Sequence, residues 1–230
     1  MPSQPLRMLG IVWAALLLTL QPAAALAQSS PLQQRLNSWP TWNLPAPLPR
    51  PAGNDLIYPD WFAGQWQATG SDLSDGNPDL HYVVHFAANA RGQIVGERAF
   101  NARSIGKALL GDQLLSVSDD PRNPNRQLAQ LQQDQRLEST VVGRRMEQPA
   151  PELFLADELA LQVLHGPGDP RVSRVETLSR YRQIDADHIE AEQWQASYGS
   201  PADGLAAEAR RSWRGSLRLE RIAIDQERPT

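Results

Sequence analysis

The chain of 230 residues contains no cysteine. Disulfide bridges, thiolate metal ligands, a thiol nucleophile and a lipid-modified cysteine are therefore excluded, and the fold has to be stable through its core. Lysine is almost absent as well: Lys107 is the only one, and acidic residues outnumber basic ones by 26 to 22. Because nucleic-acid binding needs a concentrated basic surface, this balance argues against a nucleic-acid partner.

Sequence patterns of known catalytic or metal sites are also absent. The chain has no Gly-x-Ser-x-Gly elbow, glycine-rich phosphate loop or zinc-protease pattern. His81 and His85 are four residues apart, but in a strand their Cα atoms would lie about 13 Å apart, too far to share one ion. Glu190 and Glu192 share one face of a predicted strand with His188, an arrangement that could in principle serve acid–base chemistry. The same alternation is expected for an ordinary strand face exposed to solvent. The sequence thus indicates no catalytic residue, metal ligand or cofactor, and favours binding over enzymatic activity.

Long apolar runs are missing except for one near the start. Residues 9–20 form a largely apolar run that follows the single charge of Arg7 and precedes the small residues of 25–27. As a helix this run would span only about 18 Å of a hydrocarbon core of about 30 Å. We therefore predict a cleaved signal peptide over residues 1–27 and an exported protein, with an uncleaved anchor as the competing interpretation. Without Arg7 the net charge is −5, from 21 basic and 26 acidic residues.

Proline is concentrated between Gln28 and Pro59, where seven occur. Because proline removes backbone donors, residues 28–56 are predicted to be an extended, Pro-rich segment. Trp39 and Trp42 interrupt this segment. In one interpretation both rings pack on the surface of the chain's own domain, and in the other they contact a protein partner or a membrane interface.

From residue 57 onward the sequence reads as short strands separated by turns. Strands are predicted over residues 65–72, 80–86, 93–100, 113–118, 126–133, 136–147, 172–184, 188–198 and 213–224. Gly143 is expected at a β-bulge. Residues 102–110 form either a short helix or an irregular crossing, and residues 154–163 mix the helical and strand periods. Sheets of about eight to ten such strands usually curl or close, so we predict an all-β, antiparallel barrel over residues 57–226.

Gly64 and Trp66 stand at the start of the first predicted strand. Lipocalin-like barrels begin with this Gly-x-Trp pattern, in which the indole plugs one end of the barrel and a late arginine packs across it. Arg214, Arg218 and Arg221 all lie on the last predicted strand, and we expect Arg218 to stack on Trp66. These residues are predicted to form a structural plug of a lipocalin-like barrel.

Five short segments together resemble an uncharacterised family of exported proteins from cyanobacteria and chloroplasts. They are residues 61–66, 123–127, 139–144, 174–178 and 189–193, and the resemblance covers roughly residues 57–224. It implies the thylakoid lumen or the periplasm as the compartment and implies no activity. This chain departs from the family's pattern after Tyr198, where alanine and glutamate replace a longer loop with aromatic residues.

Two functions follow from these patterns. The first is a noncatalytic lipocalin-like barrel that holds an apolar small molecule, such as a lipid, a pigment or a quinone. The alternative is an assembly or accessory factor that contacts a photosynthetic membrane complex through Trp39, Trp42 and the Pro-rich segment. The sequence does not indicate an oligomeric state.

Overall fold

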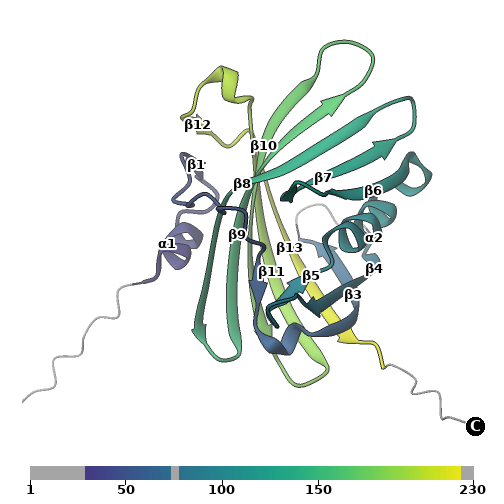
Figure 1. Cartoon of the computed structure of the whole chain (residues 1–230). Helices are drawn as coiled ribbons and strands as arrows, with labels where there is room; N and C mark the ends of the chain where they lie inside the picture. The colour runs from purple at the N-terminus through teal and green to yellow at the C-terminus, as the bar shows by residue number, and fades with distance from the viewer. Residues whose placement is uncertain (1–28, 74–77, 224–230) are drawn as a thin grey trace, which may run out of the picture.

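Eleven antiparallel strands form one curled sheet in the computed structural model, which describes residues 29–73 and 78–223 (Figure 1). In spatial order they are β2 (Ile57–Tyr58), β5 (Ile94–Gly96), β4 (Leu80–Ala88), β3 (Gly64–Asp72), β13 (Arg211–Arg221), β11 (His188–Tyr198), β10 (Arg171–Gln183), β9 (Leu153–His165), β8 (Arg136–Ala150), β7 (Asn123–Leu131) and β6 (Leu114–Asp120). The strands β1 (Asn43–Leu44) and β12 (Ala207–Glu208) form a second, small sheet. The helices are α1 (Pro31–Asn37) and α2 (Arg98–Leu110), with short 3-10 turns at Asp60–Phe62, Gly111–Gln113 and Pro201–Asp203. The predicted signal peptide lies outside the described residues.

The prediction of an all-β, antiparallel, barrel-like fold is confirmed, although the main sheet curls into a half-barrel. Its edge strands β2 and β6 do not pair with each other in the described part of the chain. Helix α2 packs against both β4 and β6 and so covers the open side. Two of its side chains replace a neighbouring strand: Ser104 accepts a hydrogen bond from the Val83 amide, and Asn101 both accepts from and donates to the backbone of His85. A sheet edge that would otherwise be free is thus satisfied by a helix.

Most strand predictions agree with the structure, including the bulge, because the β8–β9 register shifts between Val141 and Gly143. The predicted strand over residues 93–100 is wrong in its second half, since β5 ends at Gly96 and α2 begins at Arg98. Packing of α2 on β4 and β6 outweighs the local strand-like pattern there. None of the helices in the described residues is long and apolar enough to cross a membrane.

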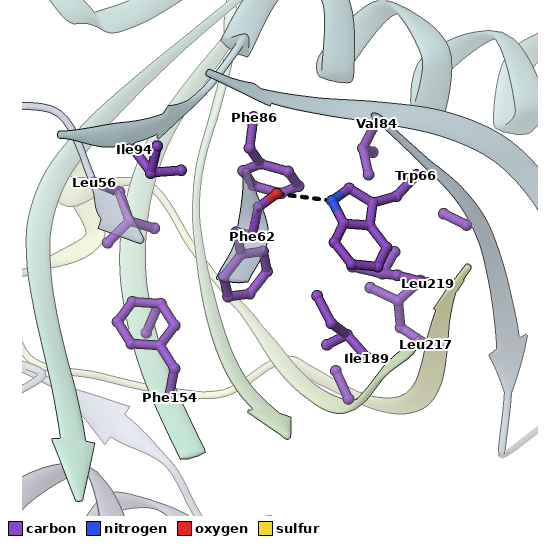
Figure 2. Packing of buried hydrophobic residues seen from close by; sticks show 13 residues of the cluster. Leu56, Phe62, Trp66, Val84, Phe86, Ile94, Phe154, Ile189, Leu217 and Leu219 are labelled. Atoms are coloured by element: carbon purple, nitrogen blue, oxygen red, sulfur yellow. Dashed lines mark hydrogen bonds between the residues drawn. The ribbon is translucent and has the colours of Figure 1, made fainter. Parts of the chain in front are cut away.

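The sheet has a hydrophobic core on each face. The inner core, inside the curl, consists of Leu56, Phe62, Trp66, Ala68, Val84, Phe86, Ile94, Phe154, Ala156, Ile189, Ala191, Leu217 and Leu219 (Figure 2). The outer core consists of Leu32, Leu36, Trp42, Leu44, Leu155, Leu178, Trp194, Ala196 and Tyr198. Strand β9 contributes Phe154 and Ala156 to the inner core and Leu155 to the outer one. Because it is buried on both faces, its sequence shows no clean alternation, which explains the ambiguous period of residues 154–163.

The Pro-rich segment starts with a helix, so the prediction that it is extended is wrong for residues 31–37. Ser30 caps α1 by accepting a hydrogen bond from the Gln33 amide, and Pro31 occupies the first helical position, where no backbone donor is needed. After α1 the segment reaches β8 at its free edge, beyond the part that pairs with β7, where the Arg144 amide donates to the Pro49 carbonyl at 2.8 Å. The chain thereby passes from the outer core to the inner core, which it enters at Leu56.

Candidate functional site

Trp66 plugs the base of the half-barrel. Its side chain is fully buried, and its Nε1 donates to the Phe62 carbonyl at 2.7 Å (Figure 2). The arginine stacked on it is Arg221, whose guanidinium carbon lies 4.1 Å from the indole centroid. The predicted pairing with Arg218 is therefore wrong. Arg221 is the register partner of Trp66, whereas Arg218 is paired with Thr69 and is exposed on the opposite face of β13.

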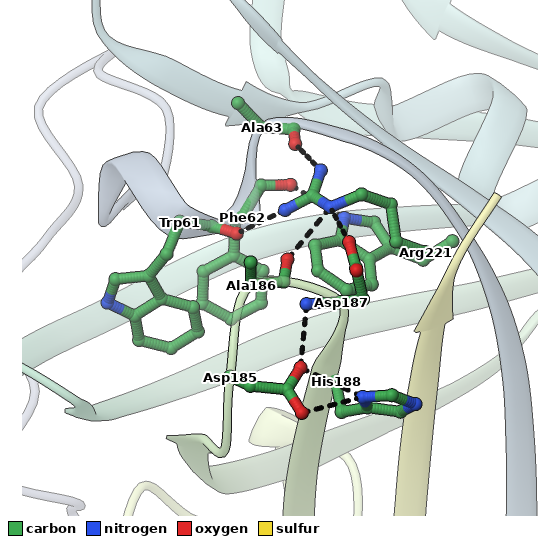
Figure 3. A network of polar contacts seen from close by, with 9 residues as sticks. Trp61, Phe62, Ala63, Asp185, Ala186, Asp187, His188 and Arg221 are labelled. Atoms are coloured by element: carbon green, nitrogen blue, oxygen red, sulfur yellow. Dashed lines mark hydrogen bonds and ion pairs between the residues drawn. The ribbon is translucent and has the colours of Figure 1, made fainter. Parts of the chain in front are cut away.

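Arg221 also closes the base by hydrogen bonding across it (Figure 3). Its Nη1 donates to the Ala63 carbonyl at 2.6 Å, its Nη2 to the Trp61 carbonyl at 3.3 Å and its Nε to the Ala186 carbonyl at 2.9 Å. An ion pair with Asp187 at 3.2 Å adds to these contacts. One side chain thus ties the entry into β3 to the turn between β10 and β11.

Gly64 is required by this arrangement. It has a positive φ of 116°, and a Cβ built at this position would lie 2.7 Å from Arg221 Nη1. Any other residue would be strained and would displace the guanidinium. Both fixed residues of the Gly-x-Trp pattern are therefore explained: the glycine leaves room for the Arg221 guanidinium, and the tryptophan fills the base of the half-barrel.

Above the inner core, the inner face of the sheet and α2 enclose a cavity of about 600 Å³. Its lining is Gly70, Ser71, Asp72, Pro78, Leu80, Tyr82, Ile105, Leu109, Gln193, Gln195, Trp213 and Ser216. Tyr82 also packs against the inner core, so the cavity begins where that core ends. Leu109 is 59% exposed, which leaves apolar surface uncovered at this site.

The sheet side of the cavity carries a ladder of polar side chains. Gln193 donates to the Ser179 hydroxyl at 3.1 Å, and Gln195 donates to the Thr177 hydroxyl at 3.2 Å. Burial, together with the neighbouring Tyr181, raises the pKa of Tyr82 to about 12. Tyr82 is therefore a neutral phenol at neutral pH. The cavity offers an apolar helix side and a hydrogen-bonding sheet side, which includes the Asp72 carboxyl group.

A smaller polar pocket of about 210 Å³ lies on the other side of Ile105, which borders both spaces. It is lined by Asp55, Leu56, Tyr58, Gly96, Arg98, Asn101, Ala102, Ile105, Gln127 and Glu158. Arg98 Nη1 donates to Asp55 Oδ1 at 2.8 Å, and Glu158 pairs with Arg144 at 2.6 Å. Burial disfavours the charged form of Arg98, but Glu158 and Asp55 outweigh it and raise the pKa of Arg98. The pocket thus contains two compensated ion pairs.

Two buried carboxyl groups lie on the outer face beneath α1. Glu176 receives a bidentate pair from Arg35, with distances of 2.7 and 2.6 Å, and a 2.6 Å hydrogen bond from the Tyr198 hydroxyl. Asp157 is fully buried beside Glu176, and neither of its oxygens has a hydrogen-bond partner among the described residues. Burial and the Glu176 charge raise the pKa of Asp157 well above its usual range. Glu176 thus fastens α1 to the sheet through Arg35, and both carboxyl groups are shielded from solvent.

The predicted partner-contact residues Trp39 and Trp42 lie in the same region. Trp42 is 1% exposed, donates from Nε1 to the Arg35 carbonyl at 2.7 Å and belongs to the outer core. Trp39 is half-buried against it, with ring centroids 4.9 Å apart. The structure thus shows Trp42 packed against the chain's own domain, as one of the two interpretations of the sequence proposed. Its ring is not free to contact a partner.

The histidines at 81 and 85 contact different residues. His85 pairs with Glu97 at 3.0 Å, and His81 contacts the Thr69 hydroxyl at 3.2 Å. In the described residues no group of three or more His, Cys, Asp or Glu side chains could hold a metal ion.

Glu192 lies in a polar outer groove. Desolvation raises the pKa of its carboxyl, but hydrogen bonds from Arg214 and Arg180 outweigh this and lower it below its usual value. Glu190 and Arg218 line the same groove. A carboxylate held ionised between two arginines is a poor general acid or base.

A protein-family model matches residues 70–214, which are 145 of the 230 residues of the chain. The matching family is described as a domain of unknown function, DUF6816. The chain belongs to this DUF6816 family. A comparison with curated proteins found no match. The DUF6816 region runs from Gly70 to Arg214 and so includes all but one of the residues that line the cavity, whereas Gly64, Trp66 and Arg221 lie outside it.

Sequence reasoning missed the cavity because α2 forms one of its walls. Residues 102–110 were expected to be either a helix or an irregular crossing, and nothing in them indicated which strands they would cover. Leu109 and Leu110 are both exposed in the structure, but the sequence does not show that exposure. The outer network was missed because Arg35, Asp157 and Glu176 are far apart in sequence.

Proposed function

We propose that this half-barrel binds an apolar or amphipathic small molecule, such as a lipid, a pigment or a quinone, in the cavity under α2 and does not chemically change it. The observation that supports this most is the cavity itself, about 600 Å³ with Leu80, Tyr82, Ile105, Leu109 and Trp213 in its lining. Ligand pockets are commonly about 300–1,000 Å³, mostly apolar, with a few polar groups that orient the ligand.

The surroundings of the cavity support a binding role over a catalytic one. The inner core is filled by buried side chains up to Tyr82, so a ligand would rest on a packed base. Asp72 and Tyr82 are the titratable side chains in the described lining, and with a pKa of about 12 the Tyr82 phenol stays protonated at neutral pH and supplies no phenolate to act as a base. Export of the chain, and the thylakoid lumen or periplasm as its compartment, stay predictions.

The test compares two exposed leucines. Leu109 lines the cavity and is 59% exposed, whereas Leu115 on β6 is 55% exposed and does not line it. Replacing either with aspartate should leave folding intact, because both side chains already face solvent. The proposal predicts that L109D weakens binding of an alkyl ketone or a fluorescent lipid by about tenfold or more, since a charge would face the bound apolar chain, while L115D binds like wild type. Equal binding by both variants would refute the cavity as the site.

A second measurement asks what the protein carries naturally. The protein purified from its own source without detergent is analysed by native mass spectrometry, and its organic extract is analysed separately. The proposal predicts a bound apolar molecule that is lost on denaturation. A preparation without such a molecule, which also gains none on titration with lipids, would contradict the proposal.

A further inference from the structure

Tyr82 marks the inner end of the cavity under α2. On β4 it lies opposite Ala68 of the inner core, and its side chain both packs against that core and lines the cavity. The end of its ring lies beside Gly70, because a Cβ built on this glycine would be 3.8 Å from the Tyr82 hydroxyl oxygen. Gly70 also lines the cavity, so its missing side chain leaves space next to the hydroxyl.

The Tyr82 hydroxyl is available for a hydrogen bond. It has no hydrogen-bond partner among the described residues, and it is not one of the polar atoms that are shut off from solvent without a partner. The amide nitrogens of Gln193 and Gln195, in contrast, already donate to hydroxyl groups of the sheet. With a pKa of about 12, the Tyr82 phenol keeps its proton at neutral pH and can both donate and accept.

Charged groups are scarce around the cavity. The described lining contains no lysine, arginine or histidine, and Asp72 is its one acid. Asp72 is four residues from Ala68, so along β3 it lies about 13 Å from the strand position opposite Tyr82. A carboxylate or phosphate would therefore meet no cation in this lining, and an ammonium group beside Tyr82 would meet no anion. Because a buried charge without a partner is costly, the inner end favours an uncharged group.

The remaining lining suits an apolar body. Helix α2 contributes Ile105 and Leu109, and β13 contributes Trp213. The indole of Trp213 lies over Gly215, since a Cβ built on that glycine would be 2.3 Å from Trp213 Cη2. The ring thus takes the place of a side chain at 215 and adds aromatic surface to the cavity.

We propose that the ligand is an uncharged amphipathic molecule whose hydroxyl or carbonyl oxygen forms a hydrogen bond with the Tyr82 hydroxyl, while its apolar body lies between α2 and Trp213. This inference rests on the proposed function and narrows it to neutral lipids and similar molecules. Fatty-acid anions and anionic phospholipids are excluded because their charge has no partner in the described lining. A plain hydrocarbon lacks the contact with Tyr82.

The experiment compares four probes with one chain length: octanol, octanoate, octylamine and octane. Their binding is measured by competition with the uncharged fluorophore Nile red. The wild type should bind octanol at least about tenfold more tightly than either charged probe. Tyr82→Phe should weaken octanol binding by about fivefold, the value of one hydrogen bond, and leave octane binding unchanged.

Tyr58→Phe is the matched control. Tyr58 also packs against the inner core but does not line the cavity, so this variant should bind all four probes like the wild type. Tyr82→Phe should fold normally, because the hydroxyl has no partner to lose in the described part of the chain. Thermal unfolding followed by circular dichroism checks both variants.

The outcomes separate this inference from the proposed function. If neither Nile red nor any of the four probes binds, both are overturned. Tighter binding of octanoate or octylamine than of octanol would overturn the uncharged head group and leave the cavity as a binding site. Unchanged octanol binding in Tyr82→Phe, or an equal loss for octanol and octane, would likewise overturn only the role of Tyr82.

Discussion

Arg221 lies over the Trp66 indole at 4.1 Å and donates to three backbone carbonyls around it. The same guanidinium thus combines a cation–π contact with hydrogen bonds that close the base of the half-barrel. Arg221 lies directly opposite Trp66 in the β3–β13 pairing. The strand register therefore brings the two side chains together.

Replacing Arg221 with methionine should lower the free energy of unfolding by about 2–4 kcal/mol, since the cation–π contact is lost and the carbonyls of Trp61, Ala63 and Ala186 lose their donors. The measurement is chemical denaturation followed by tryptophan fluorescence. Arg218→Met, on the exposed face of the same strand, should stay within about 0.5 kcal/mol of wild type. An equal effect of both variants would show that the plug does not depend on Arg221.

Gly64→Ala should destabilise the protein more than Gly92→Ala does. Both glycines have a positive φ, so both variants are strained, but only at Gly64 would the new Cβ lie 2.7 Å from Arg221 Nη1, whereas Gly92 has no heavy atom within 4 Å of that position. We expect about 1–3 kcal/mol for the strain that they share and at least about 1 kcal/mol more for Gly64→Ala. Indistinguishable melting curves for the two variants would mean that the guanidinium moves aside without cost.

Arg35→Met should cost about 3–5 kcal/mol, because Glu176 would keep its buried charge without a partner. Amide hydrogen exchange should increase most in residues 29–50, the N-terminal segment that the Arg35–Glu176 pair holds on the outer face. The double variant Arg35→Met/Glu176→Gln should recover most of the loss, because it removes the stranded charge. No recovery in the double variant would contradict the account of this network.

Asp157→Asn should change how stability depends on pH. The pKa of Asp157 is raised in the folded state by burial and by Glu176, with Arg35 and Tyr198 also in the network, while in the unfolded state it is near 3.8. Between these two values unfolding releases a proton, so the free energy of unfolding of the wild type falls as pH rises from about 4 until the folded group ionises. Asp157→Asn cannot ionise, so it should lack this decline and be the more stable form at high pH. Exposed Asp169→Asn is the control and should follow the wild-type curve; a decline that persists in Asp157→Asn would refute the assignment.

Strand alternation and turn residues are local signals, and they predicted most of the main sheet correctly. They failed where tertiary contacts decide. Residues 98–100 join a helix because Asn101 and Ser104 satisfy the edge of β4, and residues 31–37 form a helix because Ser30 and Pro31 start it on the outer face. Arg218 was chosen over Arg221 because the sequence gives the spacing of arginines but not the register that puts one of them opposite Trp66.

The sequence predicted the kind of site, an internal cavity, but not where in the fold the cavity lies. A lipocalin-like barrel implies an internal cavity, but the half-barrel fills its base with its own aromatic side chains, and the cavity lies under α2. The polar pocket depends on Asp55, Arg98 and Glu158, which come from three distant segments. No sequence spacing relates them, so their proximity appears only in three dimensions.

The central claim is that the cavity beside Trp213 takes the ligand, and contact quenching of tryptophan fluorescence tests it most directly. A bromoalkyl ketone quenches tryptophan only on close approach, and Trp213 is the tryptophan that lines the cavity. We predict saturable quenching in the wild type and its loss in Trp213→Phe, while Trp213→Phe still binds the probe in a mass-spectrometric titration. Absence of saturable quenching in the wild type, or equal quenching in Trp213→Phe, would contradict the claim.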